Sequence, residues 1–402
     1  FTLVTLGQIA FAADLHGEGD CDYLAKRLPR ELVEATGRLL VGDDQGIEHL
    51  HALLSAPRWS HAMAVSLLHA ADMSAHLRVH CPSQLAGAYL DGVSWPRVSL
   101  KGANLFEASL TAADLRGADL MYTALGKSNL RHARLCGACL NGSVAVEVDL
   151  HGADLHHVCA EAAKFVAANL EKADFTQAQL PEVWFADSNL TAAIFRDTVL
   201  LRADFTRAIL KDADFSGADL TRALLPSLRL SEAHWQGARF SEAQLEDCDL
   251  EYMNLPAADF EKANLHRALL TGSTMFGANF RGACLREAGL ADIEWENADL
   301  READLRGASF HMGSTRSGLV GSTIPCEGSR TGFYTDDYDE QTYKAPEEIR
   351  KANLCNADLR GAILDGVDFY LVDLRGALYD AKYESHLRRC GAILEARRKA
   401  QE

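Results

Sequence analysis

The residues best suited to chemistry in this chain are three cysteines and a histidine that recur at a spacing of twenty. They are Cys136, Cys139, His156 and Cys159. Thiolate and imidazole are the ligands that zinc and other soft metals prefer, and a structural site arranges four of them as a tetrahedron. A repeated sequence aligns such residues by chance, and nothing in the spacing brings all four together. We therefore expect no metal site, and these four residues are the nearest candidates for one.

A second candidate is Gly126-Lys127-Ser128, which has the last three residues of a phosphate-binding loop. The complete motif requires a glycine five residues earlier, where this chain has Met121, and a position between a strand and a helix. No combination of serine, cysteine, histidine and aspartate has the arrangement of a catalytic site. We therefore expect no nucleotide site, no cofactor and no enzyme activity.

Both candidates lie inside a five-residue repeat that organises most of the chain. From Leu90 to Phe310, every residue whose number is a multiple of five is apolar, and the residue two positions earlier is usually alanine. A period of five fits neither the period of a helix nor the alternation of a strand. A fixed short period is typical of a solenoid, and we call its large apolar residues the centres of the units.

Units such as Ala113-Asp114-Leu115-Arg116-Gly117 resemble the A(D/N)LXX consensus of the pentapeptide-repeat family. The resemblance covers more than half of the chain, and it implies a right-handed quadrilateral β-helix in which four units form one coil. Prolines agree with this frame, because each proline of the repeats directly follows a centre, where the ladder needs no N–H donor. These prolines are Pro96, Pro181, Pro226 and Pro256.

The repeat divides the chain into five parts, and the predicted fold is a β-solenoid with helical ends. The parts are an α-helical domain at 1–84, the β-helix at 85–310, a long loop insertion at 311–350, final repeats at 351–380 and a C-terminal capping helix at 381–402. The helices of the first part are predicted at 21–40, 45–54 and 59–79. An open solenoid end has unpaired backbone groups, so we expect both helical parts to cover an end.

Composition narrows the function further. The net charge of −17 argues against direct binding of nucleic acid, and no apolar run is long enough to span a membrane. The ten cysteines show no disulfide-scaffold spacing, which favours a reducing cytoplasm. Most aspartates of the repeats directly precede a centre, as Asp114 and Asp214 do, and we expect them to accept hydrogen bonds from the nearby backbone.

An apolar surface is the strongest signal of binding. Two columns that flank the centres of one face should point to solvent, yet Lys164 is their only charged residue from residue 104 to residue 186. The partner-binding candidates in these columns are Phe106, Ala124, Val144, Val146, Val166 and Trp184, here called the apolar stripe. Such patches mark interfaces, although the helical domain or the long loop folded over the stripe explains it equally well. The aromatic residues of that loop are further candidates: Phe333, Tyr334 and Tyr338.

These features predict a non-enzymatic protein-interaction module, acting as a sensor or scaffold, with a protein partner that the sequence does not name. The helices before the repeats are loosely similar to the helical end of multidomain signalling NTPases. That similarity and the first residue, Phe1, suggest the C-terminal part of a larger protein. The alternative is a DNA mimic, because family members bind DNA gyrase or topoisomerase and protect it from inhibitors. The net negative charge of the chain favours a DNA mimic. The outward columns of the repeats contain charges of both signs, which argues against it. The sequence also leaves open whether the chain forms a homodimer.

Overall fold

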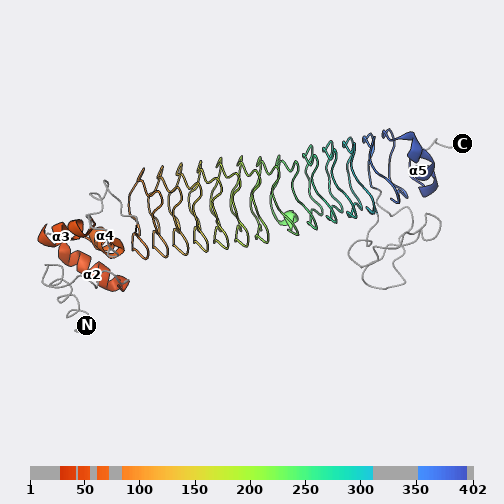
Figure 1. Ribbon diagram of the computed structural model, residues 1–402. Helices are drawn as coiled ribbons and strands as arrows, with labels where there is room; N and C mark the ends of the chain where they lie inside the picture. The colour runs from red at the N-terminus through yellow and green to blue at the C-terminus, as the bar shows by residue number, and fades with distance from the viewer. Residues whose placement is uncertain (1–27, 42–43, 55–60, 72–83, 311–351, 396–402) are drawn as a thin grey trace, which may run out of the picture. The chain divides into compact units, whose positions relative to one another are not determined.

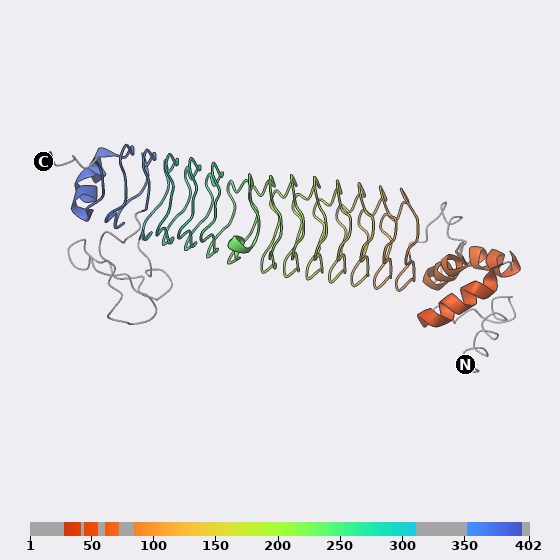
Figure 2. The ribbon, with the colours of Figure 1, turned by 180° about the vertical axis from the view of Figure 1, so that it is seen from behind.

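The computed structural model describes residues 28–41, 44–54, 61–71, 84–310 and 352–395. The chain falls into two compact units, Phe1–Thr198 and Val199–Glu402. In the first unit the described helices precede a series of stacked coils, and in the second unit the coils end in a short helix (Figures 1 and 2).

The coils of both units contain four five-residue repeats each. The residue before a centre forms a parallel bridge with the residue twenty positions later, as Asn104 does with Ala124 and Ala124 with Val144. The N–H of the centre Leu105 donates to the carbonyl oxygen of Ala124 at 2.8 Å, which continues the ladder. Residues twenty apart therefore stack in columns, as the sequence predicts, and residues of one column lie ~4.8 Å from their neighbours.

Consecutive sides of a coil are joined by a tight corner, formed by the two residues after each centre. At one such corner the N–H of Ala108 donates to the carbonyl oxygen of Leu105 at 3.0 Å, which closes a four-residue turn. The third residue of the turn has φ between 52° and 73° at every corner from Gly87 to Gly307 except at Glu232. A turn of this kind accepts proline at its second position, which explains why the prolines follow the centres.

Most left-handed corner residues are not glycine, so the corners carry backbone strain. Ala162, with φ of 54°, is exposed, whereas its neighbour Ala163 is buried. We expect Ala162→Gly to raise the free energy of unfolding by about 0.5–1 kcal/mol, because glycine relieves the strain at some cost in unfolded-state entropy. Ala163→Gly should lower it by about 1 kcal/mol. Urea denaturation of both variants tests this, and a destabilised Ala162→Gly variant would contradict it.

Aromatic rings fill the bore of each unit where the centres are phenylalanine. In the first unit Phe165 and Phe185 stack at 5.6 Å, and Phe175 and Phe195 stack at 4.9 Å. All four side chains are fully buried. Phe240, Phe260 and Phe280 form a similar stack in the second unit. The core is thus a continuous column inside each unit.

One corner of the second unit departs from the repeat. The chain makes a short 3-10 helix, η4 (Leu230–Glu232), where an ordinary corner would stand. The indole N–H of Trp235 donates to the carbonyl oxygen of Leu230 at 2.7 Å, and the indole stacks on Phe215 at 4.3 Å. A buried indole needs an acceptor, and this corner provides one.

The described helices of the first unit are α2 (Arg30–Leu40), α3 (Asp44–Leu54) and α4 (His61–Ala70). They lie within the predicted spans, or one residue from them. Of the remainders of those spans, Leu28, Pro29 and Ala71 are described and are not helical, and the other residues lie outside the described residues. Most residues of α4 are apolar and buried, in keeping with a helix packed on several sides. Gly37 permits a close approach of α2 to α4, because a Cβ atom at this position would collide with Ala70.

Helix α4 also contacts the first coil. The N–H of Tyr89 donates to Ser66 Oγ at 2.9 Å, whereas the corresponding N–H one coil later, that of Ser109, donates to the carbonyl oxygen of Ala88. His69 Nε2 lies 2.8 Å from the carbonyl oxygen of Asp91, to which it can only donate. Side chains of α4 therefore occupy hydrogen-bonding positions that a preceding coil would otherwise fill.

The repeats after the long insertion continue the same stack of coils. Glu294 bridges Asn353 and Asp299 bridges Asp358, a separation of 59 residues in place of 20. The shifted numbering of the last repeats thus reflects 39 additional residues (59 − 20) at one corner, with the register kept. Residues 311–351, and with them the candidates Phe333, Tyr334 and Tyr338, lie outside the described residues.

The helix predicted over residues 381–402 is wrong at residues 391–395, and residues 396–402 lie outside the described residues. The chain forms η5 (Ala381–Tyr383) and α5 (Glu384–Cys390), which ends at Gly391 with φ of 82°. Ile393 then bridges Asp373, and the N–H of Leu374 donates to its carbonyl oxygen at 2.9 Å. A left-handed glycine ends the helix and returns the chain to the ladder.

Candidate protein-interaction surface

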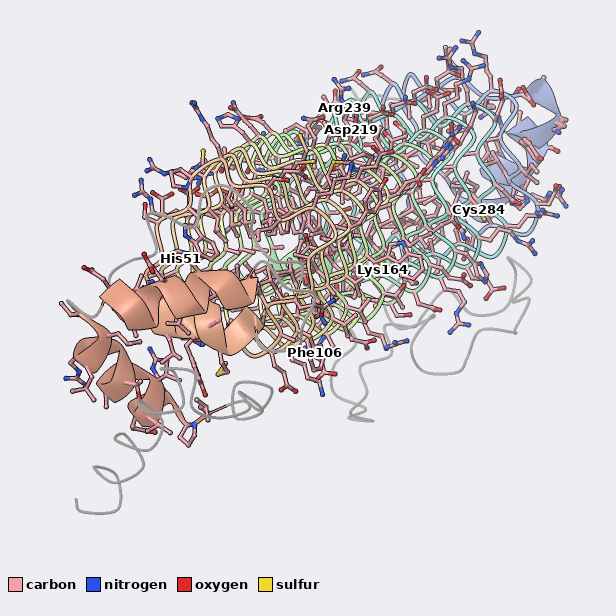
Figure 3. The ribbon with its side chains drawn as sticks, turned by 60° about the vertical axis from the view of Figure 1, so that its left-hand side comes forward. His51, Phe106, Lys164, Asp219, Arg239 and Cys284 are labelled. Carbon is pink, nitrogen blue, oxygen red and sulfur yellow. The ribbon has the colours of Figure 1, made fainter. Side chains whose placement is uncertain are left out.

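The apolar stripe lies on one face of the first unit. Ala124, Val144, Lys164 and Trp184 are joined in sequence by parallel bridges, so their side chains form one outward column. The side chains of Phe106, Val144 and Trp184 are 41%, 43% and 46% exposed. Phe106 and Lys164 lie on the same side of the coils (Figure 3). Ala124, Val146 and Val166 are half-buried between these residues. The predicted columns thus form a single surface.

The largest side chains of the stripe are held in place by their neighbours. The ring of Phe106 covers Gly126, where an added Cβ would lie only 3.1 Å from Phe106 Cδ2. The N–H of Phe106 donates to Asn104 Oδ1 at 3.1 Å. Lys164 Nζ lies 4.7 Å from the centroid of the Trp184 ring, a cation–π distance. Phe106 and Trp184 are therefore each held against a neighbouring residue of the stripe or its column.

Charged residues of both signs border the stripe along its corner. Lys127 Nζ lies 3.8 Å from Glu147 Oε2, and both side chains are about half exposed. Glu107 precedes them in the same corner column. An apolar centre with a polar rim is the usual organisation of a protein interface. The stripe thus has a charged border of both signs along this corner column.

Gly126-Lys127-Ser128, which borders this surface, is part of an ordinary corner. Lys127 has φ of 54° and its N–H donates to the carbonyl oxygen of Val146 at 2.9 Å. The hydroxyl of Ser128 is buried and donates to the carbonyl oxygen of Leu125 at 2.7 Å. The hydroxyl of Ser128 and the backbone N–H of Lys127 thus both donate to carbonyl oxygens of the coils. This tripeptide therefore does not form a phosphate-binding loop.

The aspartates that precede centres accept hydrogen bonds from the backbone, as predicted. Asp214 Oδ1 accepts the N–H of Ser216 at 3.0 Å, two residues further along. Where the second residue is arginine, the guanidinium also binds the carboxylate. Arg116 donates from Nε and Nη2 to the two carboxylate oxygens of Asp114, at 2.7 and 2.6 Å. The side-chain hydrogen bond from Arg116 lowers the pKa of Asp114.

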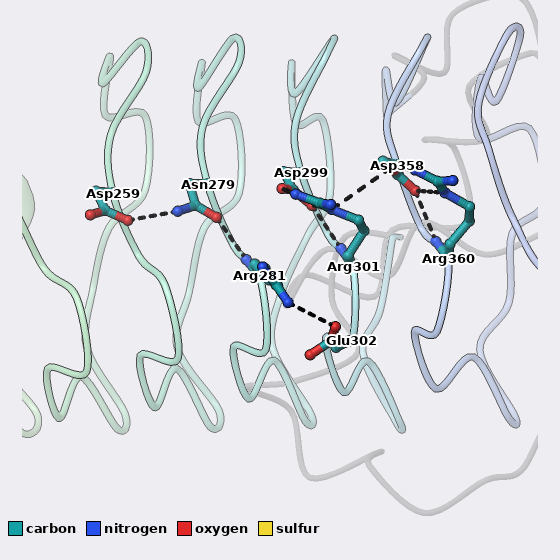
Figure 4. Close-up of polar contacts among 8 residues, drawn as sticks. All are labelled: Asp259, Asn279, Arg281, Asp299, Arg301, Glu302, Asp358 and Arg360. Atoms are coloured by element: carbon teal, nitrogen blue, oxygen red, sulfur yellow. Dashed lines mark hydrogen bonds and ion pairs between the residues drawn. The ribbon is translucent and has the colours of Figure 1, made fainter.

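The second unit has a row of these pairs (Figure 4). Asp299 binds Arg301 and Asp358 binds Arg360, and in each case the hydrogen bond from arginine lowers the pKa of the carboxyl. Arg281 Nη2 lies 3.1 Å from Glu302 Oε1 on the neighbouring coil. Although the chain has a net negative charge, Asp299, Asp358 and Glu302 of this row are paired with arginines, and Asp259 accepts a hydrogen bond from the amide of Asn279. The row therefore does not form a continuous acidic face.

The structure does not assemble the four thiol and imidazole candidates. His156 Nδ1 lies 2.8 Å from Asp154 Oδ1 and its Nε2 lies 3.3 Å from Asp174 Oδ2, so carboxylates rather than thiols surround the ring. Across the described ranges, no group of three or more histidine, cysteine and acidic side chains could hold a metal ion. Cys139 and Cys159 do stack on consecutive coils. The predicted alignment is present without the convergence that a metal requires.

A group of histidines lies near this corner and was not predicted from the sequence. The rings of His132 and His151 meet edge to face at 5.4 Å, and His151 Nδ1 lies 3.7 Å from Glu171 Oε2. His132 also lies over Gly152, where an added Cβ would meet its ring. His132 and Gly152 are twenty residues apart in the sequence, and so are His151 and Glu171. This spacing could have predicted both contacts.

A comparison with family models identifies the repeat. The model of pentapeptide repeats matches in eight copies and covers more than half of the chain. The matched residues are 83–120, 128–165, 185–222, 228–261, 254–290, 283–313 and 349–377. The chain belongs to the pentapeptide repeat family. The family predicted from units such as Ala113–Gly117 is thereby confirmed, and with it the right-handed quadrilateral β-helix of pentapeptide repeats.

Several solved pentapeptide repeat structures are similar to this chain. HetL, from the cyanobacterium Nostoc sp. strain PCC 7120, is 28% identical over 55% of this chain and 85% of HetL, with a TM-score of 0.26. QnrB1, a plasmid-mediated fluoroquinolone resistance protein, is 18% identical over 66% of this chain and 95% of QnrB1, with a TM-score of 0.24. Rfr23, from the cyanobacterium Cyanothece 51142, is 20% identical over 40% and 95%, with a TM-score of 0.17.

None of the curated proteins matches this chain. Within the part of the chain that the structure describes, no helix combines the length and apolar character needed to cross a bilayer.

Proposed function

We propose that this chain is a non-enzymatic protein-interaction module that binds its partner through the apolar stripe. The observation that carries the proposal is the exposure of Phe106, Val144 and Trp184 along one face of the first unit. Their columns are fixed by the ladder, and Phe106 and Trp184 are further held by Gly126 and Lys164. Aromatic side chains on a preordered surface supply most of the energy in many interfaces.

The polar groups of the coils support a role without catalysis. Carboxylates such as Asp114 and Asp214 are engaged by the backbone or by arginine, and the hydroxyl of Ser128 by a carbonyl oxygen. Groups so engaged form the scaffold and are not available as an acid, base or nucleophile. We also infer a cytoplasmic location, because cysteines such as Cys136 and Cys159 are free thiols.

We further propose that the N-terminal helices close the first end of the β-helix. The support is that Ser66 and His69 of α4 pair with Tyr89 and Asp91, whose counterparts in later coils pair with a neighbouring coil. Arg30 adds an ion pair with Asp91, with 2.8 Å between Nη2 and Oδ2. A covered end has fewer free N–H and C=O groups, so it is less prone to pair with another chain.

The partner can be a second copy of the chain or another protein. DNA gyrase is the alternative target, and the net charge of −17 is the observation in its favour. The pairing of Asp299 with Arg301 and of Asp358 with Arg360 weakens it, because a DNA mimic needs unpaired acids in a row. We therefore keep a general protein-binding function ahead of the gyrase target.

The test replaces two apolar residues of the stripe by acids. We expect Val146→Asp with Val166→Asp to reduce partner capture from a lysate by at least about tenfold, since buried unpaired charges oppose association. Self-association is measured in parallel by sedimentation, and purified DNA gyrase is offered as a defined bait. Ile194→Asp, a half-buried outward residue of another face, is the matched control. The proposal fails if the double variant keeps full binding and the melting temperature of the native chain.

A further inference from the structure

The thiols of Cys139 and Cys159 occupy equivalent outward positions on consecutive coils. The two residues form a parallel bridge. The N–H of Leu140 donates to the carbonyl oxygen of Cys159 at 2.6 Å, and the N–H of Cys159 donates to the carbonyl oxygen of Ala138 at 3.0 Å. Cys159 is exposed, Cys139 is half-buried, and both are free thiols. The ladder thus holds two accessible sulfurs side by side.

The spacing of the ladder allows these thiols to form a disulfide. Bridged residues on neighbouring strands lie ~4.8 Å apart, and disulfides join Cα atoms roughly 4.4–6.8 Å apart. No other pair of described cysteines is bridged in this way. Cys136 follows Arg116 and precedes His156 in its own column, so no thiol is its neighbour there.

We propose that Cys139 and Cys159 are a redox modification site, which a hydroperoxide converts into a reversible disulfide between two coils. The Cys159 sulfur attacks the hydroperoxide, so that an S–O bond forms, the O–O bond breaks, and the thiol proton leaves with the alkoxide as an alcohol. The Cys139 sulfur then attacks the sulfenic acid sulfur. The S–S bond forms, the S–O bond breaks, and hydroxide leaves with the second thiol proton as water.

The same geometry makes the disulfide easy to reduce. Side chains of one column point in the same direction, so their Cβ atoms keep roughly the 4.8 Å spacing of the strands. Relaxed disulfides have Cβ atoms about 3.8 Å apart, so closure of the bond pulls the two coils together under strain. Strained disulfides have higher reduction potentials and are the labile ones. Cys139 and Cys159 are therefore expected to stay reduced until an oxidant appears.

The experiment maps the disulfide in the full chain after treatment with hydrogen peroxide. Glu147 lies between the two cysteines, whereas no lysine or arginine lies between Arg134 and Lys164. Cleavage after glutamate therefore separates the cysteines, and trypsin does not. We expect the peptides on either side of Glu147 to remain linked after oxidation and alkylation, and to separate after reduction by dithiothreitol.

Variants assign the link to its two sulfurs. Cys139→Ser should abolish the linked peptides, and Cys136→Ser, the matched control from the same peptide, should leave them unchanged. Circular dichroism before and after peroxide checks that the coils stay folded. A link that persists in Cys139→Ser and disappears in Cys136→Ser would overturn the assignment. Full alkylation of Cys139 and Cys159 after peroxide, or oxidation of Cys159 beyond sulfenic acid without a link, would overturn the site itself.

Discussion

Replacement of Phe185 by alanine is expected to lower the free energy of unfolding of the chain by about 3–5 kcal/mol. The Phe185 ring is fully buried and stacks on Phe165 at 5.6 Å. It also meets the rings of Phe175 and Phe195 edge to face, at 5.8 and 5.6 Å. Alanine removes these contacts and leaves a cavity inside the bore. Urea denaturation followed by circular dichroism measures the loss.

The matched control is Phe106→Ala, the same substitution on the surface. Because the Phe106 side chain is 41% exposed, its removal should cost less than about 1.5 kcal/mol, and it should weaken partner binding instead. Phe185→Leu should be tolerated better than Phe185→Ala, because Leu105 and Leu125 are buried at the same position of earlier coils. Equal losses for Phe106→Ala and Phe185→Ala would show that burial does not decide the effect.

Removal of residues 313–351 is expected to leave the stability of the coils almost unchanged. Removal of residues 314–351, one residue fewer, is expected to lower the stability of the last repeats. The first deletion takes out 39 residues, the number by which the bridges of the last repeats exceed the usual separation (59 − 20). It joins Phe310-His311-Met312 to Ala352-Asn353-Leu354. The five-residue frame is then unbroken from Phe310 to Leu354. Met312 takes the left-handed corner position, which glycine would occupy more favourably.

Removal of residues 314–351 keeps one extra residue and is the control for this prediction. The natural insertion of 39 residues leaves the corner and returns to it with the register kept, whereas a single extra residue is too short to loop out in this way. It must distort the corner or shift Leu354 and the later centres by one residue, and a one-residue slip turns inward side chains outward. Exposure of two centres alone should cost at least about 3 kcal/mol. Thermal unfolding and hydrogen exchange of residues 352–380 measure both deletions. Similar melting temperatures would contradict the register argument. Partner binding by the first deletion would show that Phe333, Tyr334 and Tyr338 are not required.

The sequence predicts the coils well because each five-residue repeat is subject to the same physical constraint. Large residues such as Leu105 must fill the bore, and prolines such as Pro96 fit only at the second turn position. A constraint repeated along one frame reveals which residues point inward and which point outward. The column that contains Trp184 and the contact of Phe106 with Gly126 both follow the spacing of twenty that the frame predicts.

Features that occur once were not predictable in the same way. The turn at Leu230–Glu232 serves a single indole, and the frame of centres continues unchanged through it. The end of α5 depends on Gly391, in a segment whose apolar pattern also suits a helix. The position of His156 depends on Asp154 and Asp174, which compete with any thiol for the imidazole. Side-chain competition of this kind leaves no periodic signal.

The structure of the corners affects how the outer surface of the coils can change during evolution. Side chains of the second and third turn residues, such as Phe106 and Glu107, point away from the bore, so their identity is not fixed by the packing of the core. Selection can therefore replace a whole outward column, one residue in every twenty, while the inward column stays the same. The inward positions determine the fold, and the outward positions determine what the surface can bind. The surface can therefore change its binding properties while the fold stays the same.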